Sequence, residues 1–97
     1  LDAEDNALPP SVFRLEQNYP NPFNPTTTIS FSLPKSGNVK LTVFNLLGQE
    51  VATLLNEHKI VGNYEVKFNA EGLSSGVYIY RIESGSFIES RRMMLVK

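Results

Sequence analysis

The residues that could carry catalysis are few and scattered along this chain. His58 is the only histidine, and it lies in the polar stretch Asn56 to Gly62 beside Glu57 and Lys59. A catalytic nucleophile needs a base and an orienting group within hydrogen-bond reach. A single histidine in a polar loop supplies one of these groups at most. We therefore interpret His58 as a solvated loop residue and predict that the chain is not an enzyme.

Metal and cofactor chemistry has equally little support. Asp2, Glu4 and Asp5 could hold calcium only as an ordered loop, and they lack the glycine spacing that such loops favour. The chain has no cysteine, which excludes disulfides and thiolate metal sites. Three carboxylates on predicted strands each have a basic neighbour: Glu65 near Lys67, Glu83 near Arg81, and Glu89 near Arg91. We interpret these as cross-strand charge pairs on a wet face and predict no cofactor and no metal.

Charge and length further narrow the possible partners and the domain organisation. The formal net charge of the 97 residues is −1, with both signs interspersed, so nothing points to nucleic acid or an anionic membrane as partner. No apolar run approaches the ~20 residues of a membrane span. Residue 1 is leucine and no signal-peptide pattern follows, so we expect a piece of a longer protein. Residues 1–12, acidic and ending near Pro9-Pro10, read as an interdomain linker, and residues 13–97 as one domain.

Apolar residues alternate with polar ones along most of this domain, as in half-buried strands. We expect strands over 26–33, 39–44, 50–55, 64–68, 77–82 and 87–96, with a short edge strand near Phe13 as a seventh. A short helix is the competing interpretation for 50–55. The stretch 77–82 is apolar on both faces, which places it at the centre of a sheet. The predicted fold class is all-β, an immunoglobulin-like antiparallel β-sandwich of about seven strands.

A proline-rich segment, Leu15 to Pro25, precedes the first long strand and is called the proline arm below. Its three prolines exclude a helix and a place in a central strand. Tyr19 and Phe23 are interleaved with them, and large aromatic side chains are usually anchored. We expect a stiff arm pinned by both rings. The alternative is an ordinary loop whose two aromatics cap the core.

The last strand carries an unusual apolar run. Met93 and Leu95 point to one face and Met94 and Val96 to the other, before the final Lys97. One possibility is an exposed edge strand that invites strand addition by a partner. The other is a central strand with both faces buried.

Four blocks of this chain, in order, resemble the C-terminal sorting domain of the bacterial type IX secretion system. They are Leu-Glu-Gln-Asn-Tyr-Pro-Asn-Pro-Phe-Asn-Pro-Thr-Thr at 15–27, Val-Phe-Asn-Leu-Leu-Gly-Gln-Glu-Val at 43–51, Leu-Ser-Ser-Gly-Val-Tyr-Ile-Tyr-Arg-Ile at 73–82, and Arg-Arg-Met-Met-Leu-Val-Lys at 91–97. The flagellar hook-capping protein contains a related immunoglobulin-like domain.

The resemblance implies a non-catalytic signal at the end of a secreted cargo protein, which reaches the cell surface through the periplasm and outer membrane. Its implied partners are the outer-membrane translocon or shuttle protein, a sortase-like peptidase, and an N-terminal cargo domain. By position, partner recognition falls on these residues: Gly76, Tyr78, Met93, Met94, Leu95, Val96 and Lys97. The alternatives are an adhesive module, with Tyr64, Tyr78 and Tyr80 as a sugar platform, and a passive spacer.

Overall fold

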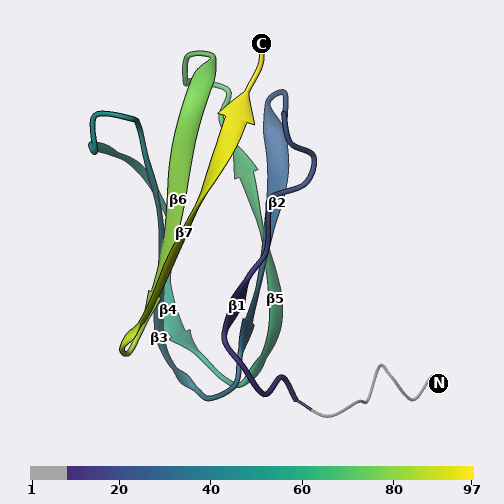
Figure 1. The fold of residues 1–97 in the computed structure, drawn as a ribbon, viewed down its shortest axis with the longest axis vertical. Helices are drawn as coiled ribbons and strands as arrows, with labels where there is room; N and C mark the ends of the chain where they lie inside the picture. Colours follow the sequence, from purple (N-terminus) through teal and green to yellow (C-terminus); the bar gives the residue numbers. More distant parts are fainter. Residues whose placement is uncertain (1–8) are drawn as a thin grey trace, which may run out of the picture.

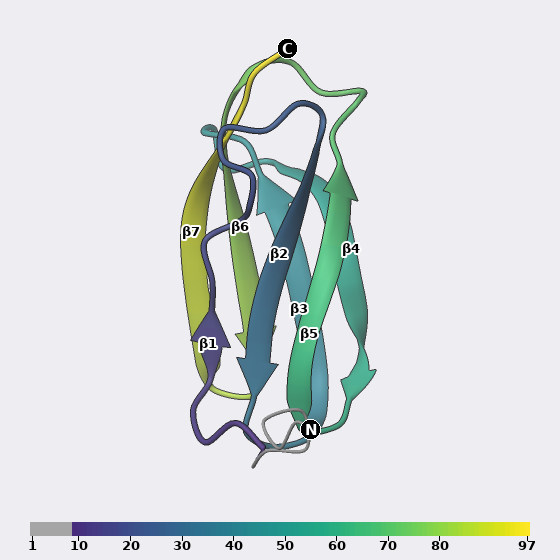
Figure 2. The ribbon, with the colours of Figure 1, turned by 90° about the vertical axis from the view of Figure 1, so that its right-hand side faces the viewer.

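The computed structural model describes residues 9–97, which form two antiparallel sheets packed face to face (Figures 1 and 2). The strands are β1 (Arg14–Leu15), β2 (Thr26–Leu33), β3 (Gly37–Phe44), β4 (Glu50–Lys59), β5 (Gly62–Asn69), β6 (Gly76–Ser84) and β7 (Phe87–Leu95). One sheet has the order β1-β2-β5 and the other β4-β3-β6-β7. The predicted immunoglobulin-like sandwich of seven strands is therefore confirmed. The predicted linker lies outside the described residues for its first eight positions.

Alternation of apolar and polar side chains produces the core between the sheets. In β2, Ile29, Phe31 and Leu33 are at most 1% exposed, while the residues between them lie nearer the surface. The other buried apolar side chains come from every strand except β4 and from the loops: Leu15, Phe23, Val39, Leu41, Val43, Phe68, Ala70, Tyr78, Tyr80, Ile82, Met93 and Leu95. Their removal from water is the main stabilising contribution to a sandwich of this size.

Strand β4 is longer than its sequence predicts. Residues 56–59, expected as a loop, continue the strand and pair with the first residues of β3, so that His58 lies opposite Asn38. The helix alternative for residues 50–55 is wrong, because this segment forms the same strand. A strand at the edge of a sheet has only one hydrogen-bonded neighbour and tolerates polar side chains. Polarity alone therefore misplaces the end of β4.

The places of β6 and β7 in the sheet determine which residues of the last apolar run, 93–96, are buried. β6 lies between β3 and β7, as its apolar composition predicts. β7 is the edge strand of the same sheet, so the expectation of a central strand buried on both faces is wrong. Met93 and Leu95 are each 1% exposed, whereas Met94 and Val96 are 43% and 47% exposed. The chain ends at the opposite end of the sandwich from its first described residues (Figure 1).

Candidate recognition surface

The proline arm joins the two sheets at the C-terminal end of the sandwich. It first continues the pairing beside β2, where Tyr19 and Thr28 exchange two backbone hydrogen bonds of 2.9–3.0 Å. It then crosses to β7, where the Phe23 N–H donates to the Met94 carbonyl and the Val96 N–H donates to the Phe23 carbonyl, both at 2.9 Å. The arm is thus an ordered part of the sandwich, hydrogen-bonded to both sheets, rather than a linker.

The two aromatic side chains of the arm have different environments. Phe23 is 2% exposed and packs against Phe68, with ring centroids 6.2 Å apart. Tyr19 is 81% exposed, so the expectation that both rings are anchored is wrong for Tyr19. Phe23 lies where the arm crosses to β7 and packs in the core, whereas Tyr19 lies beside β2 with its side chain in solvent.

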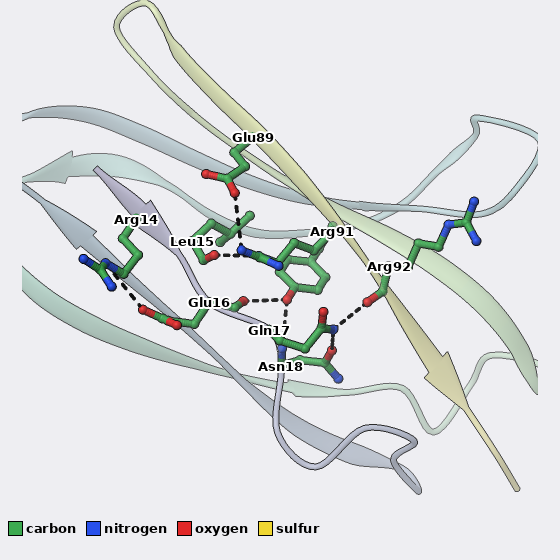
Figure 3. A network of polar contacts seen from close by, with 9 residues as sticks. Arg14, Leu15, Glu16, Gln17, Asn18, Glu89, Arg91 and Arg92 are labelled. Carbon is green, nitrogen blue, oxygen red and sulfur yellow. Dashed lines mark hydrogen bonds and ion pairs between the residues drawn. The ribbon is translucent and has the colours of Figure 1, made fainter. Parts of the chain in front are cut away.

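Tyr80, which is 0% exposed, supplies a polar anchor for the arm from within the core, at Glu16 and Asn18 (both labelled in Figure 3). Its hydroxyl accepts a hydrogen bond from the Asn18 backbone N–H at 2.8 Å and donates to the Glu16 carbonyl at 2.6 Å. Burial raises the pKa of Tyr80 to about 12, with the Asn18 N–H opposing the shift. The neutral hydroxyl is the form that satisfies both backbone groups, since a phenolate cannot donate.

Alkaline unfolding should report this anchor. Unfolded tyrosine ionises near pH 10, so the contribution of Tyr80 to stability is complete below about pH 10 and is lost as the pH rises toward 12. We expect the free energy of unfolding to fall by roughly 2–3 kcal/mol over this interval. Tyr80→Phe should be less stable than the natural chain below pH 10, and its free energy of unfolding should fall less between pH 10 and 12. Urea titrations between pH 8 and 12 would measure both effects. An equal fall in the free energy of unfolding with pH for the two proteins would contradict the prediction.

The outer edge of β7 is covered by side chains of the arm as well as by its backbone. Gln17 Nε2 donates to the Arg92 carbonyl at 2.7 Å, and Asn21 Oδ1 accepts from the Met94 N–H at 2.9 Å. Together with Phe23, these contacts occupy the outward backbone groups from the Arg92 carbonyl on β7 to the Val96 N–H just after the strand. Strand addition at this part of β7 therefore requires the arm to leave.

The residues assigned to partner recognition divide into two groups. Tyr78, Met93 and Leu95 point inward and belong to the core. The outward group is exposed: Gly76, Met94, Val96 and Lys97. Lys97 is itself tied down, because its backbone N–H donates to Ser75 Oγ at 3.0 Å and its Nζ to the Glu71 carbonyl.

A turn outside the predicted recognition residues lies at the same end of the sandwich as this group (Figure 1). Leu46 and Leu47, between β3 and β4, are 65% and 83% exposed. The Asn45 side chain holds the turn rigid, because its Oδ1 accepts the N–H groups of Leu47 and Gln49 at 2.9 and 3.0 Å. Two leucines inside a polar turn are a signal in the sequence that could have indicated an exposed apolar contact.

In the part of the chain that the structure describes, no arrangement of side chains supports catalysis, metal binding or sugar stacking. His58 lies on β4 rather than in a loop, and residues 9–97 contain no group of three or more potential metal ligands. The acidic group Asp2, Glu4 and Asp5 lies outside the described residues. Tyr80 and Tyr78 are 0% and 7% exposed, so the alternative of an aromatic sugar platform is wrong for these two rings. Within residues 9–97 no helix has the length and apolarity to span a membrane.

Comparisons with known proteins agree with this architecture. A family model described as "Secretion system C-terminal sorting domain" matches residues 17–97. Dimeric latent PorU from Porphyromonas gingivalis has a TM-score of 0.67 at 19% identity over 92% of this chain. PorZ, an essential surface component of the type-IX secretion system of the same bacterium, has a TM-score of 0.54 at 20% identity over 88%. This chain spans only 10% and 11% of those two chains. No curated protein matches it in sequence.

Proposed function

The chain belongs to the family of secretion system C-terminal sorting domains, and we propose that it directs a cargo protein through the type IX outer-membrane translocon to the cell surface. It acts by protein–protein recognition and carries no catalytic step. The similarity in fold to PorU and PorZ of Porphyromonas gingivalis supports the assignment to this system. Residues 13–97 are the sorting domain, and residues 1–12 link it to a cargo domain on the N-terminal side.

The observation that carries this proposal is the rigid display of apolar side chains at one end of the sandwich. Met94 on β7 and Val96 just after it are exposed, yet their backbone groups are held by the proline arm. A surface held in one conformation loses little conformational entropy when a partner binds. We assign the contact with the translocon or shuttle protein to Met94, Val96 and Lys97. A sortase-like peptidase then acts on the linker side.

The remaining assigned residues support this display from within. The Tyr78 hydroxyl donates to the Ser74 carbonyl at 2.7 Å, which fixes the loop that leads into Gly76 and receives the backbone of Lys97. Met93 and Leu95 anchor β7 in the core. Their role in recognition is therefore to position their outward neighbours.

A reporter fusion tests the proposal. Residues 1–97 are fused to the C-terminus of a folded reporter in a bacterium with the type IX system, beside a strain that lacks the translocon. We expect the fusion at the surface or in the medium of the first strain only. In Met94→Asp/Val96→Asp, export should fall about tenfold or more, the effect of ~1.4 kcal/mol of lost recognition.

The matched control is Ile88→Asp, which alters the same outward face of the same strand at its other end, where Ile88 is 61% exposed. This control should be exported normally. Equal loss in the control and the double variant would remove the assignment to Met94 and Val96. Retention of the folded natural fusion in the periplasm would overturn the proposed function itself.

A further inference from the structure

Three adjoining hollows of about 240, 370 and 180 Å³ form a trough that crosses β6 from the β3–β4 turn and then follows β7. The first lies under the β3–β4 turn and shares Ile79 and Ser90 with the second. The second shares Arg92 with the third, which ends against Asn21 of the proline arm. We call these three hollows the β7 trough.

The β7 trough combines apolar and basic side chains. The apolar contributors are Phe44, Leu46, Val77, Ile79, Met93 and Met94, and the basic ones are Arg81, Arg91 and Arg92. Of the described residues, no aspartate or glutamate lines any of the three hollows. The trough is thus complementary to an occupant that carries both apolar and acidic groups.

The three arginines differ in what already neutralises them. Arg81 pairs with Glu83 at 3.0 Å, and Arg91 pairs with Glu89 at 3.5 Å. Arg91 Nε also donates to the Leu15 carbonyl at 2.6 Å. Arg92 is exposed, and its guanidinium points away from these contacts, with no carboxylate of residues 9–97 in ion-pair distance (Figure 3). Arg92 is therefore the cation available to a ligand carboxylate.

The geometry also limits how an occupant lies. Because the proline arm covers the edge of β7 beyond Arg92, an added strand cannot pair there. An occupant must instead place side chains into the hollows on the outer face. From Ser90 to Met94 the trough follows β7 over a span that about five or six extended residues match at ~3.3 Å per residue.

We infer that the β7 trough binds an extended segment of a partner protein in which acidic side chains alternate with apolar ones, with a carboxylate on Arg92. The inference rests on the proposed function in that it names the chemistry by which the translocation partner is recognised. A second copy of this chain and a lipid surface are the competing occupants.

A peptide titration tests the inference without the secretion machinery. Isotope-labelled chain 1–97 is titrated with two blocked peptides of about six residues. Both have leucine at alternate positions, with glutamate between the leucines in one and lysine in the other. We expect the glutamate peptide to bind more tightly and to shift the amide resonances of Ile79, Ser90 and Arg92. In Arg92→Glu, affinity for the glutamate peptide should fall about tenfold and the preference should reverse toward the lysine peptide.

Lys67→Glu is the matched control, because it makes the same change of charge at an exposed site on β5 of the opposite sheet. It should leave both affinities unchanged. Equal binding of the two peptides, or equal effects of the two variants, would overturn the inference. So would protection of the trough amides by self-association or by anionic vesicles but not by peptide. None of these outcomes alters the export of the natural fusion, which tests the proposed function separately.

Discussion

A chain that ends at Arg92 is expected to lose its cooperative unfolding transition. The deletion removes Met93 and Leu95, each 1% exposed in the core. Loss of one such side chain typically costs ~2–5 kcal/mol, and a small domain has only ~5–15 kcal/mol of stability in total. The deletion also removes the two backbone partners of Phe23, Met94 on β7 and Val96 just after it. Thermal melts followed by circular dichroism would measure the loss.

The control for this deletion is Val96→Ser in the full chain, since Val96 is 47% exposed. Surface substitutions of this kind usually change stability by about 0.5 kcal/mol or less. A truncated chain that melts cooperatively within about 1 kcal/mol of the natural one would contradict the prediction. If the prediction holds, a failed export of the truncated chain reflects lost folding rather than a lost signal. Export should therefore be tested with side-chain variants.

Phe23→Ala is expected to destabilise the domain by about 3–5 kcal/mol, the usual cost of removing a buried phenylalanine ring. The ring is 2% exposed and lies between the sheets where the proline arm crosses to β7. Tyr19→Ala removes a ring of similar size from the same arm, but from a position that is 81% exposed. This second variant should differ from the natural chain by about 0.5 kcal/mol or less.

Urea titrations of the two arm variants give the free energies of unfolding directly, provided that the slope against urea is unchanged. If Phe23→Ala lowers the free energy of unfolding as little as Tyr19→Ala does, the arm is held by its backbone hydrogen bonds and not by the Phe23 ring. That outcome would contradict the role assigned to the ring.

The fold could be predicted from the sequence where side chains alternate strictly. The bounds of β2, Thr26–Leu33, agree with the pattern because every second residue enters the core. The same rule assigned Met93 and Leu95 to one face of β7 and Met94 and Val96 to the other. It failed at the end of β4, where an edge strand carries polar residues on both faces and shows no alternation.

The arrangement of the candidate site was less accessible from sequence. An irregular segment has no period, so nothing in the proline arm distinguishes the buried Phe23 from the exposed Tyr19. The cover over the β7 edge depends on contacts such as Asn21 with Met94, which are 73 positions apart. Such pairings follow from the packing of two sheets and have no local pattern.

These long separations also affect when the domain can fold. The arm is among the first described parts of the chain, and its partners on β7 and at Val96 are synthesised more than 70 residues later. Contacts of high sequence separation close late and slowly. The sandwich therefore cannot complete its structure while residues 94–96 are still within the ribosome. A protein whose synthesis stops before residue 94 would carry no folded copy of this surface, so the surface exists only on chains made through Val96.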